Sequence, residues 1–182
     1  MNGKDGLTVK EGATTDKVLL AYNNGTDSLL SDEQARKAFR YQIDAAGIAS
    51  AQPDAAGALG GPISLLEPGY EDLTGLYPHD ENQAGQMFSY FGAQYLTTVN
   101  LVVPEEYRSL AETIKQQIER QPRPTVNLEV LSDEDYAKRI KDGKWELTVM
   151  SMDGTDDAGI FADPDSMFHY CLLYTSDAAD EL

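Results

Sequence analysis

The chain has 182 residues, a formal net charge of −17 at pH 7 and a mean hydropathy of −0.42. A chain of this length can bury one substantial core, so we expect one domain. The acidic balance argues against a nucleic-acid partner, because such binding depends on Lys and Arg releasing counterions, and it favours a monomer kept apart by charge repulsion. No run of about 18 apolar residues occurs, so no segment is predicted to span a membrane.

The first elements predicted along the chain are a strand and a helix. Residues 17–23 contain a short apolar run and are expected to form the strand. Ser31 and Gln34 have the spacing of a capping box, which predicts a helix that begins there and runs to about residue 48. The apolar residues of this helix recur at helical spacing on one face: Ala35, Phe39, Ile43 and Ala46.

A long loop and a second helix are predicted next. Residues 49–78 are rich in Ala, Gly and Pro, which favour irregular structure over a helix or a strand. A loop of this length in a compact domain is usually functional or wraps around the rest of the domain. Asp80 is expected to cap a helix that continues to Phe91 and ends at Gly92.

The second half of the chain alternates strands and helices. Strands are predicted at 95–103, 126–130 and 145–149, with helices at 104–121 and 132–142 between them. This order implies right-handed crossovers and parallel neighbours, so the predicted fold class is α/β. The predicted core combines one face of each element: Phe39, Ile43, Leu110, Ile114, Ile118, Leu128, Val130, Leu147 and Val149.

The sequence contains no motif that predicts catalysis. A nucleophile elbow, a phosphate-binding loop and a dinucleotide-binding glycine pattern are all absent from it. His79 and His169 are ninety positions apart, so each is interpreted as a surface or loop histidine. Trp145, Tyr136 and Tyr95 lie on apolar faces and are expected in the core. We therefore predict that the protein is not an enzyme and has no cofactor.

Several short motifs occur in a fixed order along residues 17–170. They are Ala-Arg-Lys-Ala-Phe-Arg-Tyr-Gln-Ile-Asp at 35–44, Gly-Pro-Ile at 61–63, Pro-Gly-Tyr at 68–70, Tyr-Pro-His-Asp at 77–80, Gly-Lys-Trp-Glu-Leu at 143–147 and Asp-Pro-Asp at 163–165. Together they resemble the family 5 extracellular solute-binding proteins, the receptors of dipeptide, oligopeptide and nickel ABC importers. Two positions depart from the family pattern, because Gln42 replaces a small residue and Asn82 replaces the usual Pro.

The resemblance implies an incomplete α/β fold, the second lobe of a type II periplasmic-binding-protein-like fold. Residues 1–150 would form part of this lobe, and residues 151–170 would begin the crossover toward a first lobe. The full-length receptor would be periplasmic or extracellular and membrane-associated, and would deliver its solute to an ABC permease. The N-terminus lacks the apolar region of a secretory signal, so we expect Met1 to be an internal methionine of a longer protein.

The resemblance also implies where the solute binds. Asp153, Asp156, Asp157 and Phe161 would face a peptide, a nickel chelate or a similar small solute, beside the Asp-Pro motif. Peptide-binding members hold the ammonium group of the peptide with an aspartate three residues before that motif, where this chain has Ile160. A peptide with a free amino terminus is therefore in doubt, and nickel chelates, sugars and blocked peptides stay open.

The acidic residues of this segment have two other interpretations. Carboxylate oxygens are ligands for Ca²⁺, but the spacing does not match an EF-hand loop. A solvated acidic loop without a ligand is the simpler alternative, and no metal is assigned. The residues concerned are Asp153, Asp156, Asp157, Asp163 and Asp165.

The last residues, 171–182, read differently from the rest of the chain. Their amino-acid sequence matches the in-frame translation of a transposase sequencing adapter. We therefore expect that this segment is not native and contributes nothing to the fold. The only cysteine of the chain, Cys171, lies in it. The remainder therefore offers no disulfide framework, thiolate metal site or cysteine nucleophile.

Two functions of other classes stay open from the sequence alone. One is a standalone α/β enzyme, which would need a convergent polar site that the sequence offers only in the acidic segment. The other is an interaction module that binds no small ligand. A signal peptide upstream and a second lobe downstream in the full gene would favour the receptor over both.

Overall fold

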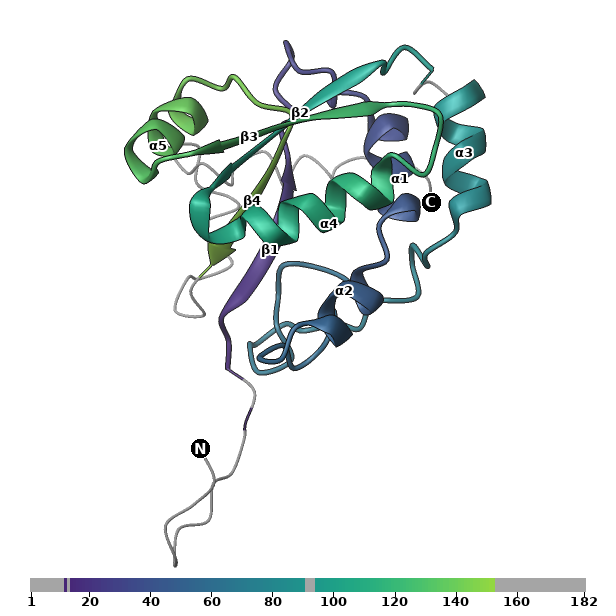
Figure 1. Ribbon diagram of the computed structural model, residues 1–182. Helices are drawn as coiled ribbons and strands as arrows, with labels where there is room; N and C mark the ends of the chain where they lie inside the picture. The colour runs from purple at the N-terminus through teal and green to yellow at the C-terminus, as the bar shows by residue number, and fades with distance from the viewer. Residues whose placement is uncertain (1–11, 13, 91–93, 153–182) are drawn as a thin grey trace, which may run out of the picture.

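The computed structural model describes residues 12, 14–90 and 94–152. A single four-stranded sheet organises them, in the order β1-β4-β2-β3 (Figure 1). Strand β2 is parallel to both β3 and β4, and β1 is antiparallel to β4. The strands are β1 (Lys17–Tyr22), β2 (Thr98–Pro104), β3 (Thr125–Leu131) and β4 (Leu147–Met152).

Helices connect these strands, which confirms the predicted α/β class. The two parallel connections each contain a helix, α4 between β2 and β3 and α5 between β3 and β4. The helical segments are α1 (Glu33–Gln42), α2 (Ala45–Ala51), α3 (Glu81–Tyr90), the 3₁₀ turn η1 (Glu105–Tyr107), α4 (Arg108–Ile118) and α5 (Asp133–Lys141). None of the helices in the described part of the chain is long and apolar enough to cross a bilayer.

The main core lies between one face of the sheet and the helices α1, α3 and α4. Alternate residues of β2 point to this face, and the ring of Phe39 on α1 meets that of Phe88 on α3 edge-on at 5.1 Å. Five predicted core residues are buried, and the other four are partly buried and pack against them. The buried five are Phe39, Ile114, Ile118, Leu147 and Val149.

The opposite face of the sheet is also buried along its centre. Val102, Thr148 and Met150 are inaccessible or nearly so, and the Tyr136 hydroxyl of α5 lies 2.9 Å from the Thr148 hydroxyl. Strand β4 is an inner strand with both faces covered, so its burial does not alternate. The strand predicted over residues 145–149 begins at Leu147 rather than Trp145.

The helix predicted over residues 31–48 is two helices. Asp32 rather than Ser31 is the N-cap of α1, because its carboxylate accepts the Gln34 amide at 2.7 Å. Helix α1 ends at Gln42, where Ile43 has an extended backbone with ψ 118°. Asp44 then caps α2, and none of the residues of α2 is buried. The prediction that Ala46 lies on the apolar face is therefore wrong.

Three further boundaries differ from or match the predictions. Strand β2 begins at Thr98, and Tyr95 lies ahead of it with 44% of its surface exposed, so Tyr95 is not a core residue. The helix predicted over 104–121 begins as the turn η1 and ends at Ile118. Gly143 follows α5 with φ +67°, as expected for a glycine that ends a helix, whereas Gly92 lies outside the described residues.

The segment 52–80 forms no helix or strand and is held against α1 and β1. The loop predicted over 49–78 therefore begins three residues later, because 49–51 belong to α2. The Arg40 guanidinium donates to the Gly60 carbonyl at 3.1 Å and lies 5.7 Å from the centre of the Tyr77 ring. Tyr41 meets Tyr77 edge-on at 5.6 Å. In Figure 1 this loop folds back beside the start of β1.

The outer edge of β3 is occupied by side chains of α4 and its C-cap. The Val126 amide donates to the Glu119 carboxylate at 2.8 Å, and the Lys115 ammonium donates to the Val126 carbonyl at 2.5 Å. Lys115 and Glu119 are themselves an ion pair at 3.3 Å.

Candidate functional site

The carboxyl ends of the three parallel strands meet at one edge of the sheet. Pro104 and Leu131 are register partners at the ends of β2 and β3, and Met152 ends β4 on the same side. The antiparallel β1 adds its first residue, because Lys17 pairs with Met152. We call these four residues the carboxyl edge. Ligands of open α/β sheets bind outside this edge, so it is the candidate site.

A shallow recess lies on the carboxyl edge where β2 ends. Two of its carboxylates come from η1 and one from the first turn of α5, so the recess is acidic. One of the three, Glu105, accepts two hydrogen bonds from Arg108 at 2.7 and 2.8 Å, which lower the pKa of Glu105. The lining residues are Pro104, Glu105, Glu106, Asp133 and Tyr136.

The tyrosine of this recess is held by the sheet rather than free to react. Its hydroxyl lies 2.9 Å from the Thr148 hydroxyl, and the Thr148 hydroxyl donates to the Val102 carbonyl at 2.7 Å. Burial raises the pKa of Tyr136, so its phenol stays protonated at neutral pH. The recess therefore presents carboxylates and a neutral phenol, groups that bind cations and polar solutes.

A buried ion pair lies at the other end of the carboxyl edge. The Lys17 ammonium and the Ser64 amide both donate to one Glu67 oxygen, at 2.5 and 2.6 Å. The Lys17 side chain is 2% exposed and that of Glu67 is 10% exposed. Hydrogen bonds from Lys17 and Ser64 lower the pKa of Glu67 to about 2, so its carboxylate is ionised at neutral pH. No sequence pattern indicated this pair, because its members are fifty positions apart.

The predicted ligand residues Asp153, Asp156, Asp157 and Phe161 lie outside the described residues, as does Ile160. Asp153 is the residue that follows Met152, the last residue of β4. Within residues 12, 14–90 and 94–152, no three His, Cys, Asp or Glu side chains are close enough together to hold a metal ion.

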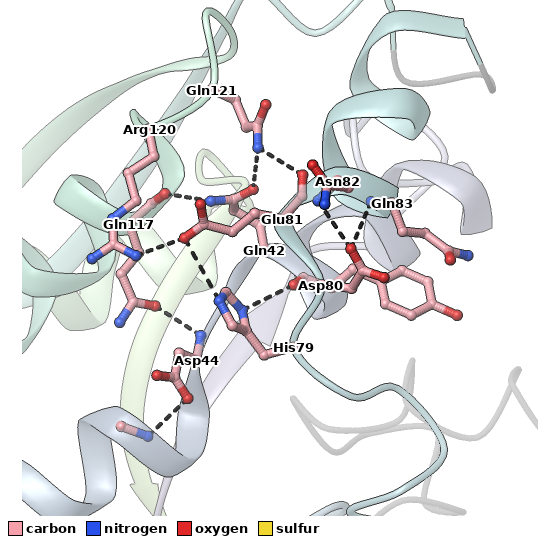
Figure 2. A network of polar contacts seen from close by, with 12 residues as sticks. Gln42, Asp44, His79, Asp80, Glu81, Asn82, Gln83, Gln117, Arg120 and Gln121 are labelled. Carbon is pink, nitrogen blue, oxygen red and sulfur yellow. Dashed lines mark hydrogen bonds and ion pairs between the residues drawn. The ribbon is translucent and has the colours of Figure 1, made fainter.

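A second polar cluster joins the ends of four helices, and we call it the helix junction (Figure 2). At its centre, the buried Gln42 amide donates to the Gln117 carbonyl at 2.6 Å and accepts from Gln121 at 3.0 Å. The Gln117 side chain in turn accepts the Asp44 amide at 2.8 Å. These bonds hold the break between α1 and α2 against the end of α4. The departure of Gln42 from the family pattern is the sequence signal that falls at the centre of this cluster.

The exposed side of the helix junction contains His79. Its Nδ1 lies 3.1 Å from the Tyr41 carbonyl and its Nε2 lies 3.6 Å from the Glu81 carboxylate. Glu81 also pairs with Arg120 at 2.6 Å. Asp80 caps α3 as predicted, because its carboxylate accepts the Asn82 and Gln83 amides. The ring nitrogens of His79 thus face a backbone carbonyl and a carboxylate, and this arrangement positions helices rather than activating a nucleophile.

No protein-family model matches the sequence, and no curated protein matches it. Solved structures do match the fold. Residues of OppA from Burkholderia pseudomallei superpose with a TM-score of 0.68 at 17% identity, over 87% of this chain and 34% of OppA. NikA from Staphylococcus aureus, solved with a nickel–histidine complex, gives 0.65 at 19% identity, over 86% of this chain and 35% of NikA.

A third match is DppA from Helicobacter pylori, an ABC transporter-associated periplasmic binding protein solved with a peptide. Its TM-score is 0.66 at 18% identity, over 86% of this chain and 30% of DppA. The chain thus spans about a third of the length of each of these three structures. These likenesses confirm the fold that the sequence resemblance implied. The chain has the mixed α/β fold of one part of a solute-binding protein.

Proposed function

We propose that this chain is one lobe of the substrate-binding component of an ABC importer, which captures a small, peptide-like solute without catalysis. Residues 1–150 would belong to the lobe and residues 151–170 to the crossover toward the other lobe. The observation that carries the proposal is the pairing of Lys17 with Met152 at the carboxyl edge. The start of β1 and the end of β4 therefore lie side by side, and the chain enters and leaves the described sheet there. This is the edge where such folds bind ligands.

This arrangement suits a receptor that closes on its solute. Two lobes joined at adjacent strand ends can rotate about that joint and enclose a solute between their carboxyl edges. Each lobe then supplies part of the buried contact surface. The matched structures include proteins solved with a peptide and with a nickel complex, which supports a solute of this kind. Such a receptor is exported, so we propose a periplasmic or extracellular location for the full-length protein.

We propose that Asp153, Asp156, Asp157 and Phe161 contact the solute. Asp153 follows Met152 in the sequence, and Met152 lies on the carboxyl edge. Carboxylates in a closing cleft would bind ammonium groups or a cationic complex through charge-assisted bonds, which strengthen when water is excluded. An aromatic ring would cover the apolar part of the solute. Ile160 at the amine-anchor position favours a blocked peptide, a nickel chelate or a sugar over a free amino terminus.

The test uses the full-length receptor, with free and N-acetylated di- and tripeptides, Ni²⁺ and a nickel–histidine complex as probes in a thermal-shift and calorimetric screen. We expect one probe class to bind the receptor and none to shift residues 1–170 alone, because one lobe cannot offset the cost of immobilising the solute. The combined variant Asp153→Asn, Asp156→Asn and Asp157→Asn should weaken binding at least about tenfold, the effect of losing a charge-assisted bond.

A matched control removes the same charge elsewhere, from three exposed aspartates: Asp27, Asp54 and Asp142. Their replacement by Asn should leave the affinity unchanged. Micromolar binding by residues 1–170 would contradict the two-lobe mode of capture. Unchanged binding in the combined variant would show that the aspartates do not contact the solute.

A further inference from the structure

A tight turn at residues 64–67 carries two adjacent leucines. Leu65 and Leu66 are 64% and 56% exposed, whereas Ser64 before them is buried. The Glu67 amide donates to the Ser64 carbonyl at 3.0 Å and closes the turn. We call Leu65 and Leu66 the leucine tip. Single exposed leucines are common on protein surfaces, but two neighbours at the end of a turn form a small apolar knob.

The base of the leucine tip is fixed. The Lys17 ammonium and the Ser64 amide share the Glu67 carboxylate, and this ion pair is almost fully removed from solvent. The pair joins the turn to a strand of the sheet. Because it is buried, solvent screens it less than an exposed ion pair. The turn is therefore ordered before any partner arrives, so a partner that covers the leucines does not bear the cost of ordering them.

The leucine tip also lies at a particular place on the sheet. Its anchor, Lys17, is the first residue of β1 and pairs with Met152, the last residue of β4. These are the points where the chain enters and leaves the described sheet (Figure 1). A second body connected through both strands must begin at this edge, and so beside the leucine tip.

We infer that the leucine tip is a contact surface for the other lobe of the receptor, an inference that rests on the proposed function. The matched structures extend about three times as far as this chain, so a parent protein of that size holds enough chain for the second body. The tip carries no charge, in a chain with 31 acidic and 14 basic residues. The tip can therefore bury apolar surface against the other lobe. Acidic side chains at the same place would instead repel a lobe with an acidic surface. The facing surface should be apolar and free of unpaired charge.

Thiol labelling tests this inference without knowledge of the solute. Leu65→Cys and Leu66→Cys are made in the full-length receptor and in the 182-residue chain, each without other cysteines. The control is Tyr90→Cys, since Tyr90 is 78% exposed at the end of α3, ahead of the amino end of β2. In the 182-residue chain all three should react with a maleimide at similar rates. In the receptor, positions 65 and 66 should react about tenfold more slowly than position 90, as expected for sites freed only by local opening.

Three other outcomes would overturn the inference. Equal rates at all three positions in the receptor would show that no lobe covers the tip, and would leave the proposed function intact. A full-length gene that encodes no second lobe would remove the proposed function and this inference together. Protection at 65 and 66 that already appears in the 182-residue chain, and grows with its concentration, would identify a second copy as the partner.

Discussion

The helix-covered face of the sheet and the 52–80 loop are both ordered, but different forces order them. The face is held by apolar side chains that recur at regular spacing, such as Phe39 and Ile114. The loop is held by a few polar and aromatic contacts to α1 and β1, with Lys17 and Glu67 at the centre of one of them. Regular burial can be predicted from a sequence, whereas contacts between distant polar residues are found only in the structure.

The largest effect is expected in the apolar core. Ile114→Ala should lower the free energy of unfolding by about 2 to 5 kcal/mol, because Ile114 is buried between α4 and the sheet and its truncation leaves a cavity. Chemical denaturation measures the change. Gln116→Ala, on the exposed side of the same helix, is the control and should stay within about 0.5 kcal/mol. An equally small change for Ile114→Ala would mean that this face of α4 is not buried in the core.

The helix junction should show a smaller effect. Gln42→Ala removes the bonds to the Gln117 carbonyl and to the Gln121 side chain. The bond to the Gln117 carbonyl is buried, whereas Gln121 keeps its bond to the Glu81 carbonyl. We expect a loss of about 1 to 3 kcal/mol, the usual cost of an unsatisfied buried polar group. Gln52→Ala, at an exposed amide, is the control. A neutral result for Gln42→Ala would show that water replaces the lost bonds.

The loop anchor should have a smaller effect still. Glu67→Gln keeps the shape of the side chain but leaves the Lys17 charge unpaired, so the turn should pull away from β1 and let Lys17 reach water. Because the loop can yield in this way, the expected loss is about 1 to 2 kcal/mol rather than the larger cost of a rigid buried pair. Glu71→Gln, at an exposed site of the same loop, is the control. A loss as large as that of Ile114→Ala would mean that the loop is as cooperative as the core.

The same ion pair predicts a dependence on pH. The folded-state pKa of Glu67 is about 2, below its ordinary value of 4.5. The ion pair therefore contributes its full stability above pH 4.5 and loses this contribution as the pH falls from 4.5 toward 2. Wild type should therefore lose more stability than Glu67→Gln over this window, by about 1 kcal/mol after allowance for solvent screening. Denaturation curves at several pH values measure the difference. Parallel curves for the two proteins would show that the pair contributes nothing.

The smallest effect is expected at the C-terminal segment. Deleting residues 171–182 should leave the thermal midpoint unchanged, because we interpret that segment as a translated adapter. Scanning calorimetry of the chain with and without it measures the midpoint. A loss of several degrees would show that the segment packs on the domain and is native.

The sequence predicted most of the fold and less of the candidate site. The strands and helices after residue 95 follow regular apolar spacing, and their positions were predicted to within a few residues. The break at Ile43 was missed, because it depends on Gln117, which lies more than seventy positions away. The predicted ligand residues from Asp153 to Phe161 stay predictions. The Lys17–Glu67 pair could not be foreseen, since only the folded loop brings the two charges together.

The side chains at the outer edge of β3 affect how this protein aggregates at high concentration. Both backbone groups of Val126 are already bonded, to Glu119 and Lys115, so a strand from another molecule cannot extend the sheet in register at that point. The outermost strand of an apolar sheet is otherwise a template for aggregation. Two charges on a neighbouring helix thus help to keep crowded copies of this chain from joining edge to edge.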